Sequence, residues 1–342
     1  TQICTQGEGR TVEHPDPMFA ALGAAVDIGT TTLAAQLYDQ DGLLATAAAP
    51  NPQRPFGADV ISRIGRSMEG DGPALANCVR QAIVGLLRTL CGQAGRRSEE
   101  IDALVLTGNT AMLHLLCGLD VSPLAAAPFQ AEELFGRYLP AAELDLPCAP
   151  GARAYLPRCM SAFVGADITT ALLASGICAG RETRMLTDIG TNGEIALWHQ
   201  GRLSCCSTAA GPAFEGANLS QGMQGAPGAI DHAWVADGAL EVHTIGEAAP
   251  AGICGSGVAD VLAGLLELGR LDETGLLNEG DDAWPLAPGV AITQGDIRQV
   301  QLAKSAVRAG IETLLARASL TPDALAELAI AGGFGSYLSL DS

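Results

Sequence analysis

The stretch Arg-Met-Leu-Thr-Asp-Ile-Gly-Thr-Asn-Gly-Glu at residues 184–194 runs from an apolar strand into an Asp-Ile-Gly-Thr turn. Most of it has an earlier counterpart at residues 24–32, which read Ala-Ala-Val-Asp-Ile-Gly-Thr-Thr-Thr. A strand and turn repeated in similar contexts indicates an internal duplication. We therefore expect two related lobes, each of which supplies one jaw of a cleft.

The chemistry of both turns suits a phosphate. Glycine lets the backbone approach an anion closely, and we expect Gly29 and Gly190 to adopt φ values that a side chain would forbid. The threonine hydroxyls and the amides of the turns would donate hydrogen bonds to the anion. The residues expected to bind phosphate are Gly29, Thr30, Thr31, Thr32, Gly190, Thr191, Asn192 and Gly193.

Three aspartates are candidates for the chemistry. Because a carboxylate repels phosphate, Asp27 and Asp188 would instead hold a hydrated Mg²⁺ between themselves and the phosphate oxygens. Asp167 stands at the start of an Ala- and Leu-rich segment, where it is either a helix N-cap or the group that orients or deprotonates an attacking water. Glu215 is either a second carboxylate in the metal shell or a solvated side chain.

Composition narrows the class of protein. The 342 residues carry a net charge of −19 with only 19 basic residues, which argues against a nucleic-acid partner. The ten cysteines lack the spacing of zinc or ferredoxin sites, so we expect reduced thiols of a cytoplasmic protein. We find neither a signal peptide nor an apolar run of roughly 18 residues, so no membrane association is expected, and a homodimer is possible.

The expected fold is α/β, with two ribonuclease-H-like, actin-like ATPase lobes and a nucleotide cleft between them. Antiparallel strands at 22–27, 33–38 and 43–49 open the first lobe, and Asn109 caps a helix at 110–117. We expect a linker at 1–20, which begins without methionine as a fragment would, a first lobe at 21–180 with an insertion at about 121–157, and a second lobe at 181–342.

A last glycine-rich turn follows an apolar strand at 328–331. Gly332, Gly333 and Phe334 are expected to form an adenosine loop, because an adenine ring can lie flat only against glycine backbone. A second glycine loop at 252–257 leads into a helix and could offer amides to an anion, although its spacing does not fit a dinucleotide motif.

The order of these pieces resembles the superfamily of acetate and sugar kinases, seventy-kilodalton heat-shock chaperones and actin. Within that superfamily the chain is similar to the ATPase region of the reductive activators of corrinoid-dependent enzymes. Six phrases carry the resemblance: Val-Asp-Ile-Gly-Thr-Thr-Thr, Phe-Gly-Ala-Asp-Val-Ile-Ser-Arg-Ile, Phe-Val-Gly-Ala-Asp-Ile, Asp-Ile-Gly-Thr-Asn-Gly-Glu, Ser-Thr-Ala-Ala-Gly-Pro-Ala-Phe-Glu-Gly and Gly-Ile-Cys-Gly-Ser-Gly.

The resemblance implies binding and hydrolysis of ATP with Mg²⁺, coupled to reduction of cob(II)alamin to cob(I)alamin in the corrinoid protein of a methyltransferase system. It also implies a [2Fe–2S] domain before the ATPase, yet no ferredoxin-type cysteines precede Ala24. Either that domain lies upstream of residue 1 in the intact protein, or the ATP serves another purpose. Two alternatives are a small-molecule kinase, in which Asp167 deprotonates a substrate hydroxyl, and a nucleotide-gated, actin-like scaffold.

Overall fold

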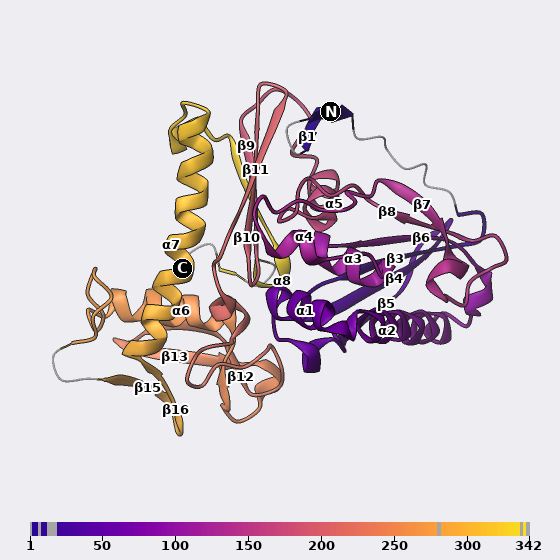
Figure 1. Ribbon diagram of the computed structural model, residues 1–342. Helices are drawn as coiled ribbons and strands as arrows, with labels where there is room; N and C mark the ends of the chain where they lie inside the picture. The colour runs from indigo at the N-terminus through magenta and orange to yellow at the C-terminus, as the bar shows by residue number, and fades with distance from the viewer. Residues whose placement is uncertain (1, 6–7, 12–18, 279–281, 336–337, 340–342) are drawn as a thin grey trace. The chain divides into compact units, whose positions relative to one another are not determined.

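The computed structural model describes residues 2–5, 8–11, 19–278, 282–335 and 338–339 (Figure 1). The chain divides into two compact units. Unit 1 comprises residues 1–180 with 201–203, and unit 2 comprises residues 181–200 with 204–342.

A six-stranded sheet in the order β5-β4-β3-β6-β8-β7 forms the centre of unit 1. β3 pairs antiparallel with β4 and parallel with β6, and β6 pairs parallel with β8. Three antiparallel strands followed by two parallel ones give the expected ribonuclease-H-like arrangement. The strands are β3 (Leu22–Ile28), β4 (Thr32–Asp39), β5 (Gly42–Pro50), β6 (Ile101–Gly108), β7 (Arg137–Pro140) and β8 (Arg153–Leu156).

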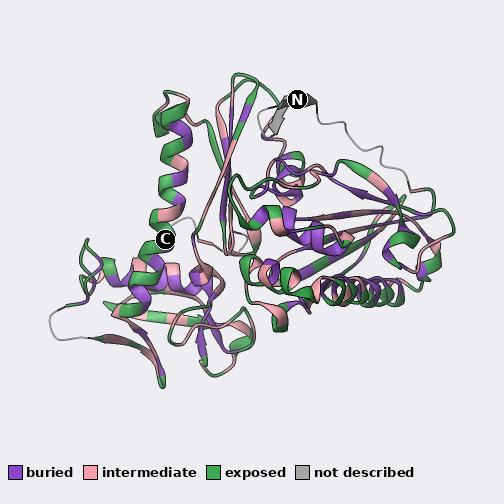
Figure 2. Ribbon diagram, in the orientation of Figure 1, coloured by how far each residue is buried: buried purple, intermediate pink, exposed green. Residues whose placement is uncertain are grey.

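The alternation of side chains along β3 separates the two faces of this sheet. Val26 and its apolar neighbours join a core with the buried face of α2, whereas Asp27 is exposed on the opposite face. Figure 2 shows buried residues gathered between the sheet and the helices beside it. The helices of unit 1 are α1 (Val60–Arg66), α2 (Gly72–Gln93), α3 (Thr110–Cys117), α4 (Ser122–Ala125) and α5 (Ala166–Ser175).

Two expectations for unit 1 need correction. The segment 121–157, which we expected to be an insertion, contains β8, the fifth strand of the central sheet, and Ala154 and Leu156 of that strand are fully buried. Residues 1–20, expected as a linker, include β1 (Gln2–Thr5) and β2 (Glu8–Thr11), which pair antiparallel. Strands of four residues are too short for alternation to reveal them in a sequence.

Unit 2 repeats the core of unit 1. Its four-stranded sheet has the order β11-β10-β9-β17, with β9 antiparallel to β10 and parallel to β17, which matches β5-β4-β3-β6. The predicted duplication is therefore confirmed in the sheets. The strands are β9 (Arg184–Ile189), β10 (Gly193–His199), β11 (Arg202–Thr208) and β17 (Glu327–Ala331); the helix α7 (Gln294–Arg317) packs on β10, and the single turn α8 (Gly332–Gly335) follows β17.

A second apolar cluster organises the rest of unit 2. It joins Ile230 of β12 to Val258 and Leu265 of α6. The elements are β12 (Ala229–Ala236), β13 (Ala239–Thr244), β14 (Gly252–Ile253), α6 (Gly255–Glu267), β15 (Ala283–Ala287) and β16 (Val290–Thr293). Throughout the described ranges of the chain, no helix has the length and apolar character needed to cross a bilayer. The nine cysteines described outside residues 2–5 and 8–11 are all free thiols.

Candidate functional site

The first turn lies between the end of β3 and the start of β4, with Ile28 paired to Leu33. Contrary to our expectation, Gly29 does not have a positive φ. The glycine is needed for a different reason, because a Cβ at this position would lie 2.6 Å from the carbonyl oxygen of Thr32. Close backbone approach, rather than an unusual φ, therefore explains this residue.

Side chains from two distant loops hold the first turn. Asn51 donates through Nδ2 to the carbonyl of Gly29 (2.8 Å) and through its backbone N–H to the carbonyl of Thr31 (2.8 Å). Asn109, which caps α3 as predicted, donates from Nδ2 to Oγ1 of Thr30 (3.1 Å). These bonds fix the backbone of the turn before any ligand arrives.

A fully buried arginine also supports the first turn. Arg63 of α1 donates from Nη2 to the carbonyl of Thr30 (2.6 Å) and from Nε to the carbonyl of Gly57 (2.9 Å). Within the described part of the chain it has no carboxylate in ion-pair distance. Burial lowers the pKa of Arg63 to about 10, so the side chain still carries its positive charge at neutral pH. A buried cation therefore contacts the predicted phosphate-binding turn.

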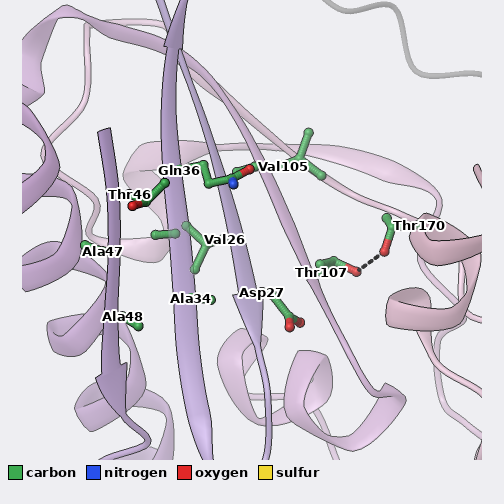
Figure 3. Close-up of a pocket in the computed structure, with 12 residues that line it drawn as sticks. Val26, Asp27, Ala34, Gln36, Thr46, Ala47, Ala48, Val105, Thr107 and Thr170 are labelled. Carbon is green, nitrogen blue, oxygen red and sulfur yellow. Dashed lines mark hydrogen bonds between the residues drawn. The ribbon is translucent and has the colours of Figure 1, made fainter. Parts of the chain in front are cut away.

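Asp27 faces a hollow on the exposed side of the sheet. This cavity of about 560 Å³ is lined mainly by small side chains, and Figure 3 shows Asp27 near the hydrogen-bonded pair Thr107 and Thr170. Thr107 is the β6 neighbour of Asp27, and its Oγ1 lies 3.2 Å from Oγ1 of Thr170 on α5. The carboxylate of Asp27 is thus at the junction of β3, β6 and α5.

Asp167 occupies the first turn of α5, but the N-cap is Gly165, so the N-cap interpretation of Asp167 is wrong. Its Oδ1 accepts a hydrogen bond from the backbone N–H of Ile168 (2.9 Å). Gly165 packs so closely on Asn109 that a Cβ would collide with the Asn109 backbone. Since Asn109 also binds Thr30, unit 1 brings the start of α5 to the first turn.

The second turn is one residue shorter, because Ile189 pairs with Gly193. Gly190 does not have a positive φ either, and a Cβ there would lie 3.4 Å from Oε1 of Glu215. Thr191 donates from Oγ1 to Oε1 of Glu215 (2.8 Å), and this hydrogen bond joins the glycine-rich loop around Glu215 to the turn.

Carboxylates lie around the second turn. Burial and then the nearby charge of Glu215 raise the pKa of Asp188 to about 6. Glu194, the cross-strand neighbour of Asp188, is also buried. Within the described residues no three His, Cys, Asp or Glu side chains are placed to coordinate one ion. The set fits a hydrated Mg²⁺, which keeps several of its waters and needs only one or two carboxylates.

The predicted adenosine loop lies beside this acidic group. Gly332 has a φ of +89°, and a Cβ there would lie 2.5 Å from Oδ1 of Asp188, so only glycine fits. The ring of Phe334 stacks on Phe214 with centroids 4.7 Å apart and planes inclined by 28°. Gly255, at the start of α6, packs against the backbone of Phe214, so the second glycine loop also reaches this region.

The structure thus forms two groups of predicted residues. Unit 1 assembles Asp27, the first turn and Asp167, whereas unit 2 assembles Asp188, the second turn and the adenosine loop. That both groups face one nucleotide stays a prediction. Sequence reasoning did not identify Arg63, Asn51 and Phe214; the only signal for Arg63 and Phe214 was their place in the quoted phrases.

Both units match one family. Residues 22–179 match the family described as the RACo middle region, and residues 182–342 match the C-terminal domain of RACo, the ASKHA domain. The chain is 35% identical over 361 aligned positions to the corrinoid activation enzyme RamQ of Eubacterium limosum, which covers 96% of the chain and 60% of that protein.

Two further relatives agree. The [Co(II) methylated amine-specific corrinoid protein] reductase of Methanosarcina barkeri is 26% identical, covering 93% of the chain and 64% of that protein. A solved structure named reductive activator for corrinoid,iron-sulfur protein superposes with a TM-score of 0.82 at 34% identity, covering 98% of the chain and 58% of that structure. The chain therefore spans about three fifths of the length of these relatives. It belongs to the RACo family, of which it contains the middle region and the C-terminal ASKHA domain.

Proposed function

We propose that this chain is the ATP-binding and ATP-hydrolysing part of a cytoplasmic activator that drives reduction of cob(II)alamin to cob(I)alamin in the corrinoid protein of a methyltransferase system. The observation that carries the proposal is the match of both units to one family, whose named relatives are a corrinoid activation enzyme and a Co(II) corrinoid protein reductase. The buried Arg63 beside the first turn and the carboxylate of Glu215 beside the second turn agree with this assignment, because a phosphate and its cation need partners of different charge.

The residues of unit 1 would bind the phosphates and prepare the attacking water. The turn from Gly29 to Thr32 would donate hydrogen bonds to phosphate oxygens, and the charge of Arg63 would stabilise the anion through that turn. Asp167 would orient or deprotonate the water that attacks the terminal phosphate.

The residues of unit 2 would hold the cation and the nucleoside. Asp188 and Glu215 would accept hydrogen bonds from the water shell of Mg²⁺, with Asp27 as a further carboxylate from unit 1. When bound, Mg²⁺ neutralises charge that develops on the phosphates. Gly332, Gly333 and Phe334 would contact the adenosine, and the lack of a side chain at Gly332 leaves room for the carboxylate of Asp188.

ATP hydrolysis would make possible an electron transfer that is unfavourable by itself. One electron would pass from a reduced [2Fe–2S] cluster, in a domain that precedes this chain in the intact protein, to cob(II)alamin, which becomes cob(I)alamin. ATP and water become ADP and phosphate in a separate step. A nucleotide that binds one arrangement of the protein more tightly shifts the population toward it, and this shift would grip or release the corrinoid partner.

The test uses the intact protein that contains this chain, its corrinoid partner and a low-potential reductant. We expect the visible spectrum of cob(I)alamin to accumulate with MgATP and not with a non-hydrolysable analogue. Asp167→Asn, which should bind MgATP normally, is the matched control. Corrinoid reduction that is unaffected by ATP would overturn the proposal, and a phosphorylated small molecule would instead indicate the kinase alternative.

A further inference from the structure

Two histidines face each other across the β12–β13 hairpin of unit 2. His232 and His243 are direct cross-strand partners, next to a bulge between Ile230 and His232. Their ring centroids lie 6.4 Å apart with planes inclined by 42°. Both side chains are nearly half exposed, at 45% and 48%, so the pair is open to solvent within this unit.

Each imidazole is held by a carboxylate on the same nitrogen. Nδ1 of His232 lies 3.0 Å from Oδ2 of Asp260, a residue of α6 that is only 3% exposed. Nδ1 of His243 lies 2.7 Å from Oδ1 of Asp231. An ionised carboxylate only accepts hydrogen bonds, so in the neutral rings Nδ1 carries the proton and Nε2 keeps its lone pair.

Neither Nε2 atom has a hydrogen-bond partner among the residues that the structure describes. A carboxylate that fixes the tautomer and leaves the other nitrogen free is the arrangement found around metal-bound histidines. Zn–N bonds of about 2.0–2.1 Å place each ring centroid roughly 3 Å from the ion, so two rings that share an ion lie about 5–6 Å apart. The observed centroid separation of 6.4 Å is slightly longer than this value, so the two rings would move closer together on binding an ion.

We propose that His232 and His243 form a two-imidazole site for a divalent transition-metal ion such as Zn²⁺ or Ni²⁺. Imidazole suits these ions, whereas Mg²⁺ prefers oxygen ligands, so the site is chemically distinct from the predicted nucleotide metal. The described residues supply no third His, Cys, Asp or Glu ligand, so water or a group from another molecule completes the coordination. The proposal is independent of the ATPase assignment.

Isothermal titration of the untagged chain with ZnCl₂ or NiCl₂, without nucleotide, tests the site. We expect about one equivalent of ion bound by wild type, and binding weakened at least tenfold in His232→Gln and in His243→Gln. The matched control is His199→Gln, because Nδ1 of His199 bonds the hydroxyl of Thr183 (2.8 Å) instead of a carboxylate, and this variant should bind as wild type does. Millimolar MgCl₂ should not compete.

A second variant distinguishes a metal site whose ligands are oriented by carboxylates from two histidines that are merely adjacent. Asp231→Asn keeps both imidazoles and removes the carboxylate that orients His243, so affinity should fall roughly 10- to 100-fold if that carboxylate supports the ligand. Circular dichroism confirms that each variant folds. Metal affinity that is the same in wild type and in the double variant His232→Gln/His243→Gln would overturn the proposal.

Discussion

The two Asp-Ile-Gly-Thr turns have the same strand order around them and follow equivalent aspartates, Asp27 and Asp188, but their other charged neighbours differ. The first turn contacts the buried cation Arg63, whose Nη2 donates to the carbonyl of Thr30. The second turn binds Glu215 through Thr191 and follows Asp188, whose pKa is raised. We therefore propose that the turn in unit 1 binds an anion and the turn in unit 2 binds a cation, and that Arg63 and Glu215, which lie outside the repeated stretch, produce this difference.

This difference predicts that the groups that act on phosphate belong to unit 1. Asp167→Asn should lower the rate of ATP hydrolysis by roughly two orders of magnitude or more, because it removes a group that orients or deprotonates water. Nucleotide affinity should hardly change, since the turn and its supports are intact. Steady-state hydrolysis together with a binding titration checks both values, and a loss confined to affinity would refute the assigned role.

A crossed pair of variants tests the assignment of charges. Arg63→Met should weaken ATP binding about tenfold both with Mg²⁺ and with a chelator, because it removes a buried positive charge and leaves the carbonyl of Thr30 without its donor. Asp188→Asn should leave binding without Mg²⁺ unchanged or tighter and should abolish most of the enhancement by Mg²⁺.

Fluorescent-nucleotide titrations in magnesium or EDTA measure all four conditions. Arg63→Lys is the matched control for Arg63→Met, since it restores the charge without the forked geometry and should recover part of the affinity. If Asp188→Asn weakens binding equally in both buffers, the second turn is not the cation site.

Replacing the glycine of the first turn, Gly29, should destabilise the protein more than replacing the glycine of the second turn, Gly190. Gly29→Ala places a Cβ 2.6 Å from a backbone oxygen that cannot move independently, so we expect a loss of about 1–3 kcal/mol in the free energy of unfolding. Gly190→Ala meets the flexible end of Glu215 at 3.4 Å and should cost less than about 1 kcal/mol. Urea denaturation of the two variants gives the comparison, and equal losses would contradict it.

The features predicted correctly from the sequence are those that depend on residues close together in the chain. The alternating strands of the first hairpins and the Asn109 cap depend on residues close together in the chain, and both were predicted correctly. The Asp-Ile-Gly-Thr repeat also predicted the duplicated sheet, because the repeated residues sit at equivalent ends of β3 and β9.

The features that we did not predict from the sequence depend on contacts between residues far apart in the chain. Arg63 contacts Thr30 across 33 positions, and nothing local in the seven-residue helix that carries it indicates that this arginine is buried. Strand β8 has four residues and is defined by its pairing with β6 about 50 positions earlier, so no local pattern reveals it. The φ prediction for Gly29 and Gly190 failed because a sequence cannot distinguish close approach from unusual backbone geometry.

A further effect on stability follows from the raised pKa of Asp188. Because this carboxyl titrates near 6 in the folded protein and near 3.8 when unfolded, the folded state binds more protons between these values. Stability must therefore fall as pH rises through this window. Asp188→Asn removes that dependence, so at pH 7.5 without Mg²⁺ it should be more stable than wild type by about 1–2 kcal/mol, which is less than the full shift because solvent screens a partly exposed group.

The advantage of Asp188→Asn should disappear near pH 4, where wild-type Asp188 is protonated in the folded protein, and millimolar Mg²⁺ should reduce it at pH 7.5 by binding the ionised carboxylate. Thermal unfolding at pH 4, 6 and 7.5, with and without the ion, measures both trends. Because Arg63 is a cation beside the first turn and not an acid, the same experiment on Arg63→Met should show no gain in stability that magnesium reverses. A stability difference for Asp188→Asn that is constant across this pH range would mean that burial near Glu215 does not set the charge preference of the second turn.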